Sequence, residues 1–265
     1  MAKSKLIRDI ISDNSSLIQV FERLLIIAME LEDENLQKWV KQELNGYSAD
    51  DNLPDYRIVG RKAVGNYQIV GGGFLQTYKN HVLPTLGFDD ETRKALENAQ
   101  VRDSISELIE AVNLMKKGKQ VGQPIPPEWF SLFEKGTNIC VTSGTLVCSE
   151  FSYNNILQRT KTRLIEVLTL LEKNFGNLDE IDIDSRNYDE KEIDALKAAV
   201  SQVLNGNHAS NTYYISNSKI KNSNIGEDNK NEKSFTTELS YHSENKDKSK
   251  SKIGSILKKI FKVRG

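Results

Sequence analysis

The sequence predicts an α+β protein: a helical N-terminal unit, a small antiparallel sheet, a long helix packed across that sheet, and an extended C-terminal tail with an amphipathic helix. Three observations lead to this prediction. Apolar residues recur at helical spacing up to residue 46, and short runs rich in Val, Ile and Tyr follow between residues 47 and 83. Helical spacing then returns over a long stretch at residues 155–174.

The composition is that of a globular chain. Its 265 residues are 38% hydrophobic and 28% charged, with a formal net charge of -1. These values exclude collagen-like, disulfide-rich secreted and polytopic membrane proteins, and no run approaches the roughly 18 apolar residues that cross a bilayer. The N-terminus has no apolar signal-peptide core, and the chain has only two cysteines. We therefore expect a cytoplasmic protein with reduced thiols.

The first 46 residues predict three helices, separated by the polar segment 13–16 and by Asp33, which supply N-caps. The middle helix is apolar along most of its length and should lie at the centre of the core. Gly46 ends the third helix, because glycine takes a positive φ without steric cost. The first helix should bury one stripe, made of Leu6, Ile7, Ile10 and Ile11.

Two later segments predict strands. Residues 56–59 and 67–70 look like separate short strands, with Gly60 and Gly65 between them, and a third strand follows the glycine turn at residues 71–73. Farther on, residues 139–149 predict a hairpin that turns at Ser143-Gly144. Such a hairpin would bring Cys140 and Cys148 face to face.

The remaining body is predicted to be helical. Its longest helix, at residues 155–174, is stopped by Gly176, and an acidic linker separates it from a last helix at residues 189–204. Shorter helices are predicted at residues 92–99, 104–117 and, with proline at its first position, 127–134.

The sequence divides into a body at residues 1–206, a linker at 207–252 and a basic helix at 253–265. Nine of the 46 linker residues are apolar and 17 are Asn or Ser, which is too little apolar surface to offset the entropy of ordering a chain. Residues 246–265 contain eight Lys or Arg and one Asp, so the other 245 residues sum to -8. We therefore expect no nucleic acid bound by the body.

A short repeat lies within the linker. Ile215, Ile220 and Ile225 recur every five residues, and Asn-Ser follows at the same offset in two of the units. Five-residue periods occur in β-helical coils, and copies from several chains could complete such a coil. Residues 211–226 are therefore a candidate homo-oligomerisation element. The other interpretation is a low-complexity linker with chance spacing.

The C-terminal segment predicts a basic amphipathic helix. Such a helix binds an anionic membrane surface, docks into a groove of a partner protein, or packs on its own body or a sister subunit. The sequence leaves these three targets open. The contact residues expected are Ile253, Ile256, Leu257, Ile260 and Phe261 on the apolar side, with Lys258, Lys259 and Lys262 on the basic side.

We find no enzyme signature in the sequence. Zinc-protease, α/β-hydrolase, Walker, kinase and dinucleotide-binding motifs are all missing, and none of the three histidines has a metal-ligand partner at helical spacing. We therefore predict no metal and no cofactor, assign no catalytic residue, and consider a non-enzymatic protein the better interpretation, with the question of an enzyme left open.

Two adjacent segments form a recognisable motif: WVKQELNGY at residues 39–47 and LPDYR at residues 53–57. They resemble the signature of the AbiTii domain, a family named for an abortive-infection system of bacterial phage resistance. The similarity covers about residues 4–176. It implies a role in antiviral defence as a sensor, adaptor or toxic effector, and it brings no catalytic residues. The motif positions here are Trp39, Glu43, Asn45, Gly46, Tyr47, Asp55, Tyr56 and Arg57.

Two roles are open for these motif residues, an interaction site or a structural one. On the structural interpretation, Arg57 and Glu43 form an ion pair that locks the third helix to the first strand. For the whole chain we predict a defence module that acts as an oligomeric, non-enzymatic sensor or effector, through membrane or partner contact by the C-terminal helix. The alternative is a nuclease or nucleotide-acting effector with an unrecognised active site.

Overall fold

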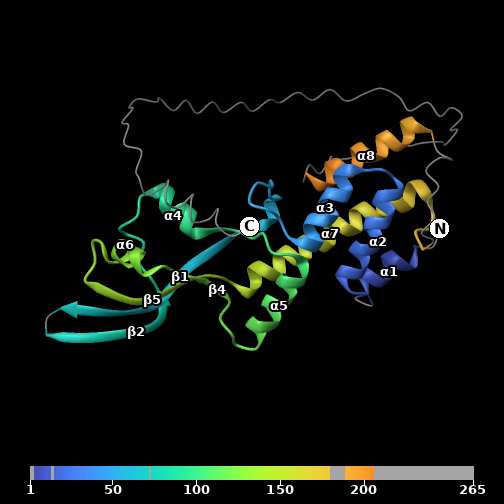
Figure 1. Ribbon diagram of the computed structural model, residues 1–265. Coiled ribbons are helices and arrows are strands. Elements are labelled where there is room, and N and C mark those ends of the chain that lie inside the picture. Colours follow the sequence, from blue (N-terminus) through green and yellow to red (C-terminus); the bar gives the residue numbers. More distant parts are fainter. Residues whose placement is uncertain (1–2, 13–14, 72, 180–188, 206–265) are drawn as a thin grey trace, which may run out of the picture.

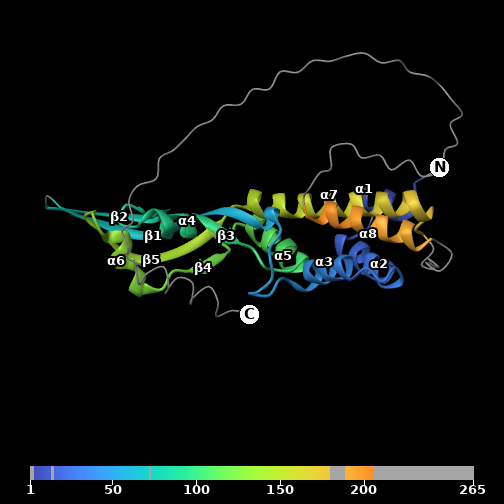
Figure 2. The same cartoon turned by 90° about the horizontal axis from the view of Figure 1, so that it is seen from above.

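The computed structural model describes residues 3–12, 15–71, 73–179 and 189–205. It confirms the α+β class. The described residues form an elongated body with a helical half at one end and a sheet at the other (Figures 1 and 2). The predicted linker and basic helix, with Ile215, Ile220, Ile225 and residues 253–265, lie outside the described residues.

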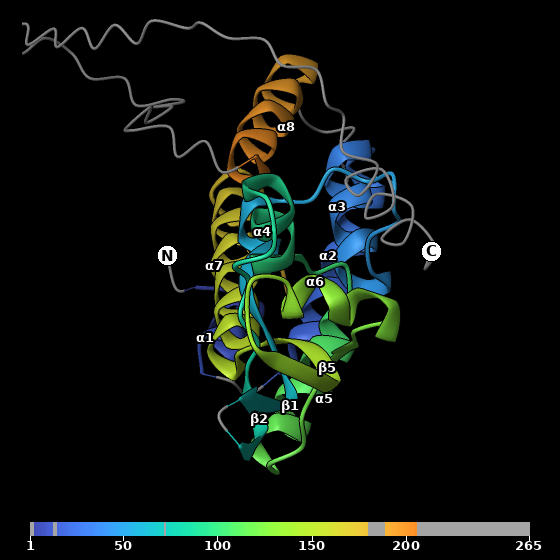
Figure 3. The same cartoon turned by 90° about the vertical axis from the view of Figure 1, so that its left-hand side faces the viewer.

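The helical half encloses the largest apolar core, to which six helices contribute. Seen from the sheet end, α7 and α3 lie on opposite sides of this half, with α8 at the top of the view (Figure 3). These helices are α1 (Lys5–Ile11), α2 (Leu17–Glu30), α3 (Glu34–Asn45), α5 (Ile105–Lys116), α7 (Glu150–Phe175) and α8 (Glu190–Leu204).

Polar side chains begin these helices as the sequence predicts. Ser16 and Gln19 form a reciprocal capping box at the start of α2, and Ser104 and Glu107 form another at the start of α5. The Asp33 carboxylate accepts a hydrogen bond from the backbone amide of Leu36 at 3.0 Å. Each cap satisfies backbone donors that have no partner inside the helix.

α1 is held by carboxylates from a distant part of the chain. Asp179 accepts hydrogen bonds from the backbone amides of Lys5 (3.0 Å) and Leu6 (3.1 Å), and Glu172 accepts one from Ser4. Leu6 and Ile10 are buried as predicted, but Ile11 is 58% exposed. The prediction for Ile11 was wrong because the helix ends there, so its side chain passes beyond the core.

The sheet is antiparallel, with strand order β2-β1-β5-β4, and β3 pairs with the start of β1. A second apolar core lies between this sheet, η2 (Pro127–Trp129), α4 (Asp90–Glu97) and α6 (Phe130–Glu134). The hairpin of β1 and β2 reaches out at the far end of the body (Figure 1). The strands are β1 (Ile58–Gly71), β2 (Phe74–Val82), β3 (Asn98–Gln100), β4 (Gly122–Pro124) and β5 (Ile139–Cys148).

Two strand predictions are corrected. Residues 58–71 form one strand rather than two, and residues 56 and 57 belong instead to the short helix η1 (Asp55–Arg57). Residues 139–148 likewise form one strand, paired along β1, rather than a hairpin. Cys140 and Cys148 therefore lie at opposite ends of β5, opposite Gln68 and Arg61 of β1, and do not face each other.

Close packing explains two of the glycines that the sequence presented as breaks. Gly65 and Gly144 are partners across β1 and β5. A Cβ atom on Gly65 would lie 2.0 Å from the carbonyl oxygen of Ser143, and one on Gly144 would lie 2.9 Å from a methyl carbon of Ile125. These glycines therefore allow strands and side chains to approach closely inside a continuous sheet.

The long helix α7 does not lie across the sheet as predicted. It contacts α1, α2, α5 and α8 in the helical half. Only its first turns meet the sheet end, where Tyr153 and Ile156 pack with Tyr56 and Ala99. The helix predicted at residues 92–99 ends at Glu97, because the chain turns there into β3.

Candidate functional site

Five of the motif side chains meet in one buried cluster around the carboxylate of Glu43. Its Oε1 accepts hydrogen bonds from the hydroxyls of Tyr47 and Tyr56, each at 2.6 Å. Its Oε2 accepts one from Nη2 of Arg57 at 2.5 Å, and both side chains of this ion pair are fully buried. The predicted pair of Glu43 and Arg57 is therefore present. Three donors offset the cost of burying the carboxylate.

Gly46 makes this convergence possible. It ends α3 at φ +87°, and a Cβ atom there would lie 2.9 Å from the carbonyl oxygen of Arg102. The next residue, Tyr47, donates its backbone amide to that same carbonyl at 2.8 Å. Its ring then folds back under the guanidinium of Arg57, 4.8 Å away, and its hydroxyl reaches Glu43. The chain reversal therefore depends on glycine.

Arg57 connects three segments. Besides Glu43 on α3, its guanidinium donates through Nη1 to the backbone carbonyl of Asp103, just before α5. Its own carbonyl accepts a hydrogen bond of 2.9 Å from the amide of Val101. Removal of the guanidinium would therefore leave unpaired acceptors on two elements, which is a structural role for this motif residue.

The two phenols and the guanidinium of the cluster keep their protons near neutral pH. Burial, and then the nearby charge of Glu43, raise the pKa of Tyr47 and of Tyr56 well above the usual phenol range. Burial lowers the pKa of Arg57, but the Glu43 carboxylate outweighs it, and the pKa of Arg57 is raised overall. Both phenols therefore remain donors and the guanidinium remains charged, so the cluster is unsuited to proton transfer near neutral pH.

A second group of contacts leads from the cluster to α8. The hydroxyl of Tyr56 accepts a hydrogen bond from Nε1 of Trp39 at 3.1 Å, and its ring lies 4.4 Å from the guanidinium of Arg163 on α7. Arg163 donates to Oδ1 of Asp55 at 2.8 Å and to the carbonyl of Leu204 at 2.7 Å. Leu204 is the last residue of α8, where backbone carbonyls lack helical partners and a cation is favourable.

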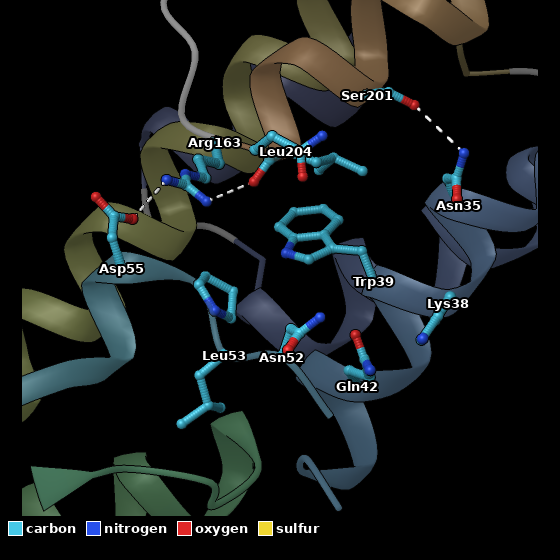
Figure 4. Close-up of a pocket in the computed structure, with 12 residues that line it drawn as sticks. Asn35, Lys38, Trp39, Gln42, Asn52, Leu53, Asp55, Arg163, Ser201 and Leu204 are labelled. Carbon is cyan, nitrogen blue, oxygen red and sulfur yellow. Dashed lines mark hydrogen bonds and ion pairs between the residues drawn. The ribbon is translucent and has the colours of Figure 1, made fainter. Parts of the chain in front are cut away.

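A cavity of about 370 Å³ opens beside this connection (Figure 4). It lies between α3, α8, the start of η1 and Arg163 of α7. Its wall combines amide, hydroxyl, charged and apolar side chains. The lining residues are Asn35, Lys38, Trp39, Gln42, Asn52, Leu53, Pro54, Asp55, Arg163, Ser201, Leu204 and Asn205.

The motif residues are thus divided between two places. Trp39, Glu43, Tyr47, Tyr56 and Arg57 form the cluster, and Gly46 positions it. Asp55 lies at the cavity, where its side chain is 69% exposed, and Asn45 is exposed at the end of α3 and is not part of the cluster.

Sequence reasoning missed Arg163. A signal was present, because its position continues the buried stripe of α7 made by Ile156, Thr160, Leu164 and Val167. A cation in a buried stripe requires acceptors nearby.

Two features are missing from the described ranges. They contain no group of three or more His, Cys, Asp or Glu side chains placed to hold a metal ion. Every helix in these ranges is also too short or too polar to span a bilayer.

The fold and the site define an α+β protein whose charged motif is internal and is joined to the end of its last described helix. The family model AbiTii matches residues 4–198, so the chain belongs to the AbiTii family. The family name refers to abortive infection, a bacterial defence against phage. The match extends beyond the expected residue 176 into α8 and ends before Ser201, Leu204 and Asn205. No curated protein and no solved structure matches the chain.

Proposed function

We propose that this chain is a non-enzymatic sensor and effector of abortive infection. The body receives the infection signal, residues 211–226 assemble several copies, and the basic segment 253–265 delivers the effect by binding an anionic membrane surface. On this proposal the protein works in the cytoplasm and reaches the membrane only peripherally. A partner protein bound by the same segment is the second way in which the tail could act.

The observation that carries the proposal is the connection of Asp55 and Tyr56 through Arg163 to Leu204. It joins the family motif to the end of α8, and the chain continues from there into the linker. A change in the motif or the cavity can therefore alter how the base of the tail is held. This arrangement supports a body that controls its tail.

The geometry of the cluster argues against the Glu43–Arg57 pair as a nuclease site. Glu43 and Arg57 are fully buried and bonded to each other, so neither reaches a phosphodiester in solution. An assay of plasmid and total-RNA cleavage with Mg²⁺ or Mn²⁺ separates the two candidates. We expect intact nucleic acid. Cleavage that the purified chain retains through two chromatographic steps would contradict the proposal.

The basic and apolar residues of the segment 253–265 would provide the free energy of binding to the membrane. Each Lys or Arg close to an anionic bilayer contributes about 1 kcal/mol, and the apolar stripe of Ile253, Ile256, Leu257, Ile260 and Phe261 adds buried surface. One such helix binds weakly and reversibly. Several helices on one assembly bind much more tightly, because each later contact is intramolecular.

Vesicle sedimentation tests the membrane step. The full chain should sediment with vesicles that contain phosphatidylserine and remain in solution with neutral vesicles. A chain that ends at Lys252 should stay in solution with both. As a matched control, Lys116→Gln and Lys117→Gln remove two charges at the end of α5 and should leave sedimentation unchanged, whereas Lys258→Gln and Lys259→Gln should reduce it. Equal sedimentation of the full and shortened chains would overturn this step.

Light scattering tests the assembly step. Replacement of Ile215, Ile220 and Ile225 by Ser should reduce the molar mass to that of one chain. The matched control replaces Ile253, Ile256 and Ile260 by Ser and should keep the assembly. A parent chain that is monomeric at all concentrations would remove oligomerisation from the proposal.

A further inference from the structure

The cavity beside Trp39 has the size of a small-molecule site. Its volume of about 370 Å³ falls within the range of roughly 300–1,000 Å³ typical of ligand pockets. The indole of Trp39 on α3 and the side chain of Leu204 on α8 provide apolar walls (Figure 4), and Pro54, just before η1, is also part of the lining. Such walls suit the faces of a flat ring system.

Half of the polar side chains in the lining are carboxamides. Asn35, Gln42, Asn52 and Asn205 carry amides, which combine a donor and an acceptor in one plane, and Ser201 adds a hydroxyl. Two of these amides already have a partner, since Asn35 donates to Ser201 and Gln42 bonds to Asp51. Asn and Gln form paired hydrogen bonds with the edges of nucleobases, because those edges also place a donor beside an acceptor. The lining therefore matches a heterocyclic base better than an aliphatic ligand.

The charges of the lining suit one anionic group. Arg163 is already bonded to Asp55 and to the carbonyl of Leu204, so it holds the wall together. Lys38 is different: its side chain is 68% exposed, and its ammonium lies 4.0 Å from Asp51, which is outside the lining of the cavity. A phosphate attached to a bound base would find this ammonium at the mouth of the cavity.

From these three features we infer that the cavity binds a nucleoside monophosphate, with the base against the amides and the phosphate at Lys38. The ligand would bridge α3 and α8, which across the cavity share a single weak hydrogen bond of 3.5 Å from Asn35 to Ser201 in the described part of the chain. It would thereby hold the end of α8 in place and, resting here on the proposed function, restrain the tail until the ligand leaves.

The end of the family match at residue 198 affects which base we expect the cavity to prefer. Ser201, Leu204 and Asn205 lie beyond residue 198, where the match ends. One wall of the cavity therefore lies outside the family match. The preference for a particular base should accordingly belong to this chain and need not extend to the family.

Fluorescence of Trp39 provides a direct test. The chain has two tryptophans, and Trp129 lies in the separate core beside the sheet. In the full chain with Trp129→Phe, Trp39 is the remaining indole, and titration with AMP or GMP should change its emission saturably. Calorimetry on the unaltered full chain gives the same answer if that variant is unstable. No saturable signal by either method would overturn the inference.

Matched ligands and variants test the assigned contacts. Inorganic phosphate and ribose 5-phosphate should bind at least about tenfold more weakly than the nucleotide, because they lack the base. Lys38→Glu should weaken AMP about tenfold and leave adenosine unchanged, and Gln42→Leu should weaken both. Lys94→Glu on α4, an exposed lysine far from the cavity, is the control. Equal binding of ribose 5-phosphate, or unchanged binding in Lys38→Glu and Gln42→Leu, would contradict the assignment.

The same proteins separate this inference from the proposed function. If the nucleotide fails to bind but tail-dependent sedimentation with vesicles persists, the cavity assignment is wrong and the proposed function stands. If the nucleotide binds but deletion of residues 253–265 has no effect on vesicle binding, the site stands and the proposed function is wrong. Turnover of the bound nucleotide would contradict the non-enzymatic part of the proposal and support the ligand class.

Discussion

Arg163 of α7 donates a hydrogen bond of 2.7 Å to the backbone carbonyl of Leu204, the last residue of α8. The same guanidinium bonds to Asp55 and covers the ring of Tyr56, two residues of the family motif. One side chain thus connects the motif to the C-terminal end of α8. α8 is otherwise held by apolar packing: Leu196 and Val200 are buried, and Ile193, Val203 and Leu204 are partly buried against the same core.

Replacement of Arg163 by Met should loosen α8 without unfolding the body. The loss of one charged hydrogen bond and one partly exposed ion pair should cost about 1–2 kcal/mol. Amide hydrogen exchange in residues 196–204 should therefore accelerate about tenfold or more, while exchange in α2 stays unchanged.

Arg159 offers a matched control for this variant. It lies one helical turn earlier on α7, is 56% exposed, and approaches the same carboxylate only to 3.9 Å. Arg159→Met should leave the exchange of α8 unchanged. Equal acceleration in both variants would mean that charge near Asp55, rather than the bond to Leu204, holds the helix.

Glu43→Gln should strongly destabilise the whole body. It leaves Arg57 buried without a counter-charge, which costs roughly 3–5 kcal/mol. Urea unfolding followed by circular dichroism measures this change. The double variant Glu43→Leu with Arg57→Leu should lose less than the sum of the two single variants, because the pair is coupled.

The exposed pair of Arg93 and Asp90 on α4 is the comparison. Arg93→Gln should change stability by no more than about 0.5 kcal/mol, as is typical of surface ion pairs. A Glu43→Gln chain as stable as Arg93→Gln would refute the structural role assigned to the cluster.

Because Tyr47 and Tyr56 are buried, we expect the stability of the folded chain to fall at alkaline pH. Their pKa values are raised in the folded chain, mainly by burial, so folding favours the protonated form. This contribution is complete below the ordinary phenol pKa of about 10 and is lost as the pH rises above it. The midpoint temperature of thermal unfolding should therefore fall less steeply between pH 8 and 11 in the double variant Tyr47→Phe with Tyr56→Phe than in the parent chain.

Tyr78 is a suitable control for the alkaline series. Its ring stacks on Tyr67 in the β1–β2 hairpin, 5.1 Å between centroids and far from Glu43. Tyr78→Phe should keep the steep fall of the parent chain. The same slope in the parent and the double variant would show that the buried phenols are not the cause.

Because Asp179 holds α1, we expect the stability of the folded chain to fall at acid pH. Burial raises the pKa of Asp179, but the amides of Lys5 and Leu6 outweigh it, and the pKa is lowered overall. A lowered pKa stabilises the folded chain above the unfolded value of about 3.9, and this stability is lost as the pH falls below it. Asp179→Asn should lower the free energy of unfolding at pH 6 and should reduce the difference in that free energy between pH 6 and pH 3.5. The exposed Asp90→Asn should change neither quantity. An unchanged pH difference in Asp179→Asn would refute the capping role.

The sequence predicted features that depend on local patterns and on charge. The helix caps at Ser16 and Asp33 and the glycine at residue 46 follow from local backbone chemistry, and all three are present. The Glu43–Arg57 pair, predicted to lock the third helix to the first strand, is present, although Arg57 lies on η1 just before that strand. Its burial and its two tyrosine donors were not predicted, since they depend on how the motif segments pack.

Features set by distant contacts were not predictable in this way. Gly65 and Gly144 looked like turns because the residues that pack against them are distant in the sequence. Gly65 meets Ser143, and Gly144 meets Ile125. The cavity needs the end of α8 beside α3, and no local pattern specifies that approach. Arg163 was missed for the same reason, because its acceptors come from residues 55 and 204.

Protection of cells against phage measures the central claim most directly. Cells that express the full chain, the chain ending at Lys252, and the full chain with Lys94→Glu should be compared by the efficiency of plaque formation, with protein levels and folding checked in parallel. We predict that the shortened chain folds and accumulates normally but protects no better than an empty control, while Lys94→Glu protects fully. Full protection by the shortened chain would contradict the claim that the body acts through its tail.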